Sequence, residues 1–158
     1  MHSFATMTMQ LTPDQNQTPA HGEEERSEAR RASVQPQRIA IVEDELAVAW
    51  SLQSTAEDLG HEVIGVFASG EAALEVLGEE QADLLFLDVD LGEGIDGIET
   101  ARRLRERQPI GILFITGSPD AETRARIAKA IPDAKLMGKP VFRDALEETI
   151  AELAARGD

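Results

Sequence analysis

Cysteine is absent from the 158-residue chain, and histidine is scarce. Without cysteine the chain can build no disulfide, thiolate metal site, iron–sulfur cluster or thiol nucleophile. The three histidines are His2, His21 and His61, and two of them lie in the N-terminal segment. This distribution argues against a histidine-built metal or catalytic site. Any bound ion would then be held by oxygen ligands, which points to Mg²⁺ or Ca²⁺.

Positive charge and long apolar runs are also lacking. The chain has 15 Lys and Arg residues against 30 Asp and Glu residues, a net charge of −15. A field of that sign opposes binding to the phosphates of nucleic acids. No apolar run approaches the length of about eighteen residues that a membrane span needs, and the N-terminus has no signal-peptide pattern. We therefore expect a cytoplasmic protein that binds neither nucleic acid nor membrane.

The N-terminal segment, residues 1–37, has no sustained apolar period and is rich in Gln, Thr, Pro and Glu. Such a segment cannot bury enough apolar surface to offset the entropy that ordering costs. We expect a disordered tail, in which the mixed Glu and Arg residues of 23–32 form at most a transient charged helix. A docking arm is the functional alternative for this segment.

From residue 38 onward, short apolar runs alternate with helical periods, which predicts one domain over residues 38–156. Strands are expected at residues 39–42, 62–67, 84–89, 111–116 and 134–137, and helices at about 46–59, 69–77, 96–107, 119–130 and 141–155. This alternation is typical of right-handed β-α-β units. The predicted fold class is α/β: a doubly wound five-stranded parallel sheet with helices on both faces.

Unusual polar residues lie at the carboxyl ends of the predicted strands. Glu43 and Asp44 follow the first strand, Asp88 lies at the end of the third and Thr116 at the end of the fourth, and Lys139 follows the fifth. In an open parallel sheet, chemistry is found at the carboxyl ends of the strands, near the point where the strand order reverses. We therefore expect three carboxylates, a hydroxyl and an ammonium group to share one site.

These residue types suit magnesium-assisted phosphoryl transfer. Crowded carboxylates repel one another unless a cation lies between them, and Mg²⁺ prefers oxygen ligands, such as carboxylates and the main-chain carbonyl of Asp90. Asp88 ends the most apolar strand, and a rigidly held carboxylate can attack phosphorus to form an acyl phosphate. Lys139 would supply a positive charge, and Thr116 a hydroxyl donor, to the phosphoryl oxygens.

The segments IAIVEDE, LLFLDVDLGEGIDGIE, LFITGS and MGKPV resemble the receiver domain of two-component response regulators, and the resemblance extends over residues 38–156. It implies the flavodoxin-like receiver fold and phosphorylation of Asp88 by a histidine kinase or a histidine phosphotransfer protein. It also implies that Thr116 and Lys139 contact the phosphoryl group. The implied Mg²⁺ ligands are Glu43, Asp44, Asp88 and the carbonyl of Asp90.

The resemblance carries further expectations about activity and partners. Because the chain ends soon after the last predicted helix, we expect a single-domain regulator that acts by protein contact or as a phosphate relay or sink. It would not be an enzyme, apart from its own Mg²⁺-dependent phosphorylation and dephosphorylation. The surface that receivers use for homodimers or outputs would carry the basic residues Arg124, Arg126, Lys129, Lys135 and Arg143.

Other positions depart from the family pattern or refine it. Leu136 stands where receivers commonly carry a switching Tyr or Phe, so signalling would rely on Thr116 and the segment after it. The stretch FITGSP is partly similar to the FATGUY group of stand-alone receivers. The bond before Pro140 is expected to be cis, as it often is in the family. Trp50 is expected to pack in the core or in a partly exposed position, with a kinase contact as the alternative.

Two enzyme motifs offer alternatives. Asp88 and Asp90, with Thr116 and Lys139, are similar to motifs of haloacid-dehalogenase-type phosphatases, in which Asp88 would again be the nucleophile. That class needs an acidic pair at a later strand end, whereas here the pair comes first. Residues 92–97 form a G-x-G-x-x-G pattern, but the surrounding carboxylates would repel a dinucleotide pyrophosphate. We expect its glycines to permit a flexible loop, with Asp96 capping the next helix.

Overall fold

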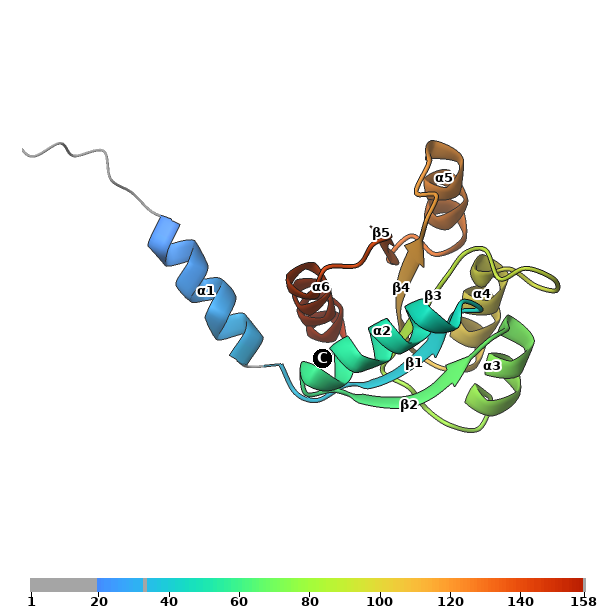
Figure 1. Cartoon of the computed structure of the whole chain (residues 1–158), viewed down its shortest axis with the longest axis horizontal. Coiled ribbons are helices and arrows are strands. Elements are labelled where there is room, and N and C mark those ends of the chain that lie inside the picture. The colour runs from blue at the N-terminus through green and yellow to red at the C-terminus, as the bar shows by residue number, and fades with distance from the viewer. Residues whose placement is uncertain (1–19, 33, 158) are drawn as a thin grey trace, which may run out of the picture.

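The computed structural model describes residues 20–32 and 34–157, which include a single five-stranded parallel sheet in the order β2-β1-β3-β4-β5 (Figure 1). The strands are β1 (Arg38–Val42), β2 (Glu62–Phe67), β3 (Leu84–Leu87), β4 (Gly111–Thr116) and β5 (Lys135–Gly138). The helices are α1 (Ala20–Ala32), α2 (Leu46–Asp58), α3 (Gly70–Leu77), α4 (Gly97–Arg107), α5 (Ala121–Ala130) and α6 (Arg143–Arg156). The predicted α/β fold class is confirmed, and the strand order reverses at β1, beside β3.

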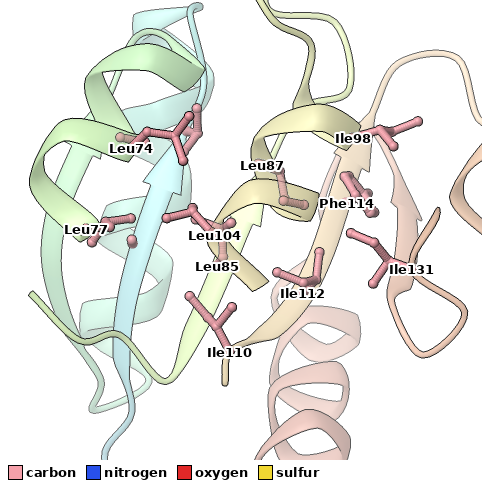
Figure 2. Close-up of a cluster of buried hydrophobic side chains, with 14 of the residues drawn as sticks. Leu74, Leu77, Leu85, Leu87, Ile98, Leu104, Ile110, Ile112, Phe114 and Ile131 are labelled. Carbon is pink, nitrogen blue, oxygen red and sulfur yellow. The ribbon is translucent and has the colours of Figure 1, made fainter. Parts of the chain in front are cut away.

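The central strands β1, β3 and β4 are mostly apolar and buried because both faces of the sheet are covered, as parallel sheets require. On one face, α3, α4 and α5 pack against alternate strand residues such as Leu85, Ile112 and Phe114 (Figure 2). On the other face, α2 and α6 pack against the intervening residues, including Phe86 and Ile115. Two separate cores therefore hold the central strands rigidly, and with them the residues at the strand ends.

Capping side chains mark the starts of α3, α4 and α5. Ser69 and Asp96 cap α3 and α4 as expected, accepting hydrogen bonds from the N–H groups of Ala72 at 3.1 Å and Glu99 at 2.9 Å. The expectation that Pro119 lies in the first turn of α5 is wrong. Asp120 caps that helix instead, and its carboxylate accepts a hydrogen bond from the main-chain N–H of Thr123. A carboxylate at this position stabilises the unpaired N–H groups of the first turn.

Trp50 does not belong to the buried side of α2. Its side chain is 65% exposed, and Leu46, one turn earlier, is 61% exposed. The buried face of the helix is formed by Ala49, Leu52 and Ala56. The apolar residues of this helix thus extend beyond the face that contacts the sheet. Of the two expected placements of Trp50, the core is wrong, and the side chain is largely exposed.

Residues 20–32 form α1 within the segment for which a disordered tail is expected. The expected charged helix at residues 23–32 falls inside it, whereas the first nineteen residues of the predicted tail lie outside the described residues. Glu, Arg and Ala are good helix formers, which favours local helix even without an apolar face. None of the described helices combines the length and the apolarity that crossing a bilayer requires. The domain boundary near residue 38 stays a prediction.

Gln108 is a buried polar anchor between α4 and the segment that leads into β3. Its Oε1 accepts a hydrogen bond from the N–H of Ala82 at 3.0 Å, and its Nε2 donates to the carbonyl of Leu77 at 2.7 Å. We expect Gln108→Leu to lower the free energy of unfolding by about 2–4 kcal/mol, because buried main-chain groups lose their partners. Urea unfolding would measure this. The exposed Gln81→Leu change serves as the control and should cost under about 0.5 kcal/mol.

Candidate functional site

Asp88 occupies the carboxyl end of β3, at the centre of the sheet. Its main-chain N–H donates to the carbonyl of Val42 at 3.0 Å, which continues the β1–β3 ladder up to this residue. The residue is only 7% exposed. Its carboxylate Oδ1 accepts a hydrogen bond from the N–H of Asp90 at 3.1 Å. The predicted nucleophile is therefore fixed through both its backbone and its side chain.

Lys139 follows β5 and lies between two carboxylates. Its Nζ is 2.8 Å from Oδ2 of Asp88 and 2.9 Å from Oε2 of Glu43. The contact with Asp88 is a directed hydrogen bond, whereas Oε2 of Glu43 is buried and forms an ion pair with no directed hydrogen bond. The ammonium group thus balances part of the negative charge that the strand ends bring together.

Burial and neighbouring charges shift the pKa values of Glu43 and Lys139. Burial raises the pKa of Glu43, and the nearby carboxylate of Asp88 adds to this, although Lys139 opposes both effects. Burial acts to lower the pKa of Lys139, but the two carboxylates beside it outweigh burial and raise it. The ammonium group therefore stays charged at neutral pH, which suits a role in holding anionic oxygens.

Asp44 completes an acidic group that fits a small hard cation. Carboxylate oxygens of Glu43, Asp44 and Asp88 all lie within 4.8 Å of one another. Glu43 and Asp88 are buried, but Asp44 is exposed, so the group opens to solvent on one side. Oxygen ligands with an open side suit Mg²⁺, which keeps several of its waters. The convergence of these three predicted residues follows from the neighbouring positions of β1 and β3 (Figure 1).

Thr116 ends β4 at the same edge of the sheet. The residue is fully buried, and its hydroxyl accepts a hydrogen bond from the N–H of Ser118 at 3.2 Å. Its carbonyl accepts a hydrogen bond from the N–H of Lys139 at 2.9 Å, which ties the ends of β4 and β5 together. The Lys139–Pro140 peptide bond is cis, as expected. Space around Gly117 is open, because a Cβ there would have no neighbour within 4 Å.

The glycines after Asp88 serve the backbone in two ways. Gly92 and Gly94 have φ values of +74° and +90°, which residues with a Cβ rarely adopt. Gly97 begins α4 directly against the backbone of Asp88, where a Cβ would lie 2.8 Å from the carbonyl carbon of Asp88. The sequence pattern suggests a flexible turn but gives no sign of this close contact, because it depends on how α4 packs.

Three of the five basic residues of the expected interaction surface have partners within the chain. Arg126 forms an ion pair with Asp96, which caps α4. Lys135 lies 2.7 Å from Oε2 of Glu152, and the Nε of Arg124 donates to the carbonyl of Pro119 at 3.0 Å. These contacts account for part of the positive charge on this face without a second subunit. Homodimerisation through it stays a prediction.

Comparison with known proteins identifies the family. Residues 39–151 match the model of the response regulator receiver domain, so the chain belongs to that family. It is 37% identical over 119 residues to the response regulator receiver protein CpdR of Brucella abortus, covering 70% of this chain and 92% of CpdR. The resemblance found in the sequence is confirmed.

Other relatives are longer than the shared region. The TorCAD operon transcriptional regulatory protein TorR of Escherichia coli is 39% identical over 85 residues, which are 54% of this chain but only 36% of TorR. Among solved structures, the signal receiver domain of a modulated diguanylate cyclase from Desulfovibrio desulfuricans aligns with a TM-score of 0.72 at 35% identity, covering 77% of this chain and 96% of that one. The common element is the receiver domain.

Proposed function

We propose that the chain is a response regulator whose Asp88 accepts a phosphoryl group from a histidine kinase or a histidine phosphotransfer protein. The observation that carries this proposal is the position of Asp88, which is held at the centre of the sheet with Lys139 at 2.8 Å and two further carboxylates beside it. An Asp88 carboxylate oxygen would attack phosphorus, and the bond to the donor would break. The family match makes this chemistry the one best supported.

The other residues of the site would divide the remaining tasks. Glu43, Asp44, Asp88 and the carbonyl of Asp90 would hold Mg²⁺, which when bound supplies positive charge for the phosphoryl oxygens. The ammonium group of Lys139 would leave Glu43 and bind a phosphoryl oxygen, since it already lies beside the carboxylate of Asp88. The hydroxyl of Thr116 would donate to the same group, after rotating from the contact it makes with Ser118.

The direct experiment is incubation with Mg²⁺ and a small acyl-phosphate donor, followed by mass spectrometry of the intact protein. We expect one phosphoryl group per chain, little or none without Mg²⁺, and none on Asp88→Asn. A haloacid-dehalogenase-like phosphatase would instead hydrolyse many equivalents of sugar or nucleotide phosphate. Repeated turnover of such substrates, with no stable phosphorylated protein, would therefore favour the alternative.

We propose that the phosphorylated chain acts in the cytoplasm. It would either bind a partner protein or serve as a phosphate relay or sink for the kinase. CpdR, which this chain nearly spans, is also a receiver protein, and this supports a regulator that works as a receiver alone. Pull-down with wild type and Asp88→Ala, each with and without the phosphodonor, separates the two roles. A partner that binds only the phosphorylated wild type supports signalling by contact. Rapid loss of phosphate from the kinase without any such partner supports a sink.

The side chain of Asp90 is expected to influence the lifetime of the phosphorylated state. It is exposed, two residues after Asp88, while its N–H holds the Asp88 carboxylate. We expect Asp90→Asn to change the rate of dephosphorylation by more than about twofold, because the carboxylate positions or repels the attacking water. Decay of the phosphorylated protein, followed by mass spectrometry, measures this rate. Glu93→Gln, which removes a charge further along the same turn, should leave it unchanged; equal rates for Asp90→Asn and wild type would contradict the prediction.

A further inference from the structure

The turn after Asp88 passes beside the acidic group and is anchored on the core at two points. Leu91 is buried, and Ile95 packs against the core cluster beneath α3 and α4. Between these anchors, Gly92 and Gly94 have left-handed backbone conformations. A Cβ placed on Gly92 would lie 3.7 Å from Oδ2 of Asp44, so this part of the turn lies against one of the proposed Mg²⁺ ligands.

Glu71 supports this turn at Gly94 and Ile95. Its Oε1 accepts a hydrogen bond from the N–H of Ile95 at 2.8 Å, a contact between residues 24 positions apart in the chain. Its carboxylate also packs on Gly94, where an added Cβ would lie 2.9 Å from Cδ of Glu71. The N–H of Ile95 lowers the pKa of Glu71, so this side chain is ionised at neutral pH and accepts as a carboxylate.

The elements on either side of the turn are fixed relative to each other. Gly70 brings the first turn of α3 against α4, since a Cβ on Gly70 would lie 2.9 Å from a side-chain carbon of Ile95 and closer still to the hydroxyl of Thr100. At the far end, Asp96 caps α4 and pairs with Arg126 of α5. Glu71 therefore projects from a fixed base onto the part of the turn that contains the two left-handed glycines.

We propose that Glu71 is a positioning residue for the Mg²⁺ site, because it holds the turn at residues 92–95 and with it the main chain of Asp90 and the surroundings of Asp44. This inference rests on the proposed function, in which Asp90 and Asp44 are Mg²⁺ ligands. In the part of the chain that the structure describes, no hydrogen bond or ion pair joins Glu71 to Glu43, Asp44 or Asp88. Without the hydrogen bond between Glu71 and Ile95, the two glycines would let the turn sample other conformations. Part of the free energy of Mg²⁺ binding would then be used to order the turn.

The test is a Mg²⁺ titration of the full chain followed by the NMR shifts of main-chain amides, at about 0.15 M salt so that general charge effects are screened. We expect Glu71→Ala to weaken Mg²⁺ binding by about threefold to tenfold and to accelerate hydrogen exchange at the Ile95 amide. Glu71→Gln loses the charge but keeps an oxygen acceptor, so its affinity should stay within about twofold of wild type. Glu75→Ala removes a charge one turn along α3 and should bind as wild type does.

The Gly94→Ala variant provides an independent approach to the same contact. It should also weaken Mg²⁺ binding, through backbone strain at a φ of +90° and through the clash with Glu71. The strain remains in a Glu71→Ala background, but the clash does not, so the loss there should be smaller. Equal affinities for Glu71→Ala and Glu75→Ala, or a loss in Glu71→Gln as large as in Glu71→Ala, would overturn the inference. Absence of Mg²⁺ binding in the wild type would instead count against the proposed function itself.

Discussion

In Mg²⁺-free buffer, Lys139→Ala is expected to lower the free energy of unfolding by about 2 kcal/mol, because it leaves the buried carboxylates of Glu43 and Asp88 without their cation. The value is below that of a fully buried pair because 19% of the Lys139 side chain is exposed. Mg²⁺ should then stabilise the variant more than it stabilises the wild type, since the metal no longer competes with an ammonium group for the same oxygens. Urea unfolding of both proteins, with and without Mg²⁺, measures the difference.

The same variant should separate metal binding from phosphorylation. Removing Lys139 takes away a charge proposed to stabilise the phosphoryl oxygens, so the rate of phosphorylation should fall by about a hundredfold even where Mg²⁺ binds more tightly. Lys135→Ala is the matched control, because it breaks an exposed ion pair with Glu152 and should cost under about 1 kcal/mol. Equal stabilisation of Lys139→Ala and wild type by Mg²⁺ would show that Lys139 and the metal do not share ligands.

Gly97→Ala is expected to have the largest effect on the fold around the site. The new Cβ would lie 2.8 Å from the carbonyl carbon of Asp88 and 3.0 Å from Cα of Val89, and closer still to the carbonyl oxygen of Asp88. These neighbours are main-chain atoms, which cannot move aside as a flexible side chain can. We expect a loss of about 3 kcal/mol or more in unfolding free energy, together with loss of phosphorylation, because α4 must shift away from β3.

The control for this substitution is another glycine of the same edge. Gly117→Ala places a Cβ where no atom lies within 4 Å, at a φ that does not require glycine. Its unfolding free energy should stay within about 0.5 kcal/mol of wild type. A Gly97→Ala protein as stable as Gly117→Ala would mean that the contact between α4 and β3 is looser than the structure indicates.

Much of the fold could be predicted because its signals are local. The short apolar runs and helical periods identify the five strands and the five helices that cover them, and the rule for parallel sheets brings their carboxyl ends together. Glu43, Asp44, Asp88, Thr116 and Lys139 are found at that edge as predicted. Their roles in phosphoryl transfer stay predictions.

What could not be predicted depends on packing between distant elements. The rotation of α2 decides that Trp50 is exposed, and no local period reveals it. Glu71 appears in the sequence as an ordinary first-turn acidic residue, and only the approach of α3 to α4 brings it to the Ile95 amide. The expected helix start at Pro119 is wrong because the carboxylate of Asp120 accepts a hydrogen bond from the N–H of Thr123 and caps the helix one residue later.

Asp88 is proposed as the phosphoacceptor of a site shared with residues at the carboxyl ends of β1, β4 and β5. Peptide mass spectrometry identifies the modified residue in the wild-type chain after phosphorylation by an acyl phosphate in Mg²⁺, once reduction has trapped the aspartyl phosphate. We expect modification at Asp88 alone and none in Asp88→Asn. Modification at another carboxylate in the wild type, or equal phosphorylation of Asp88→Asn, would contradict it.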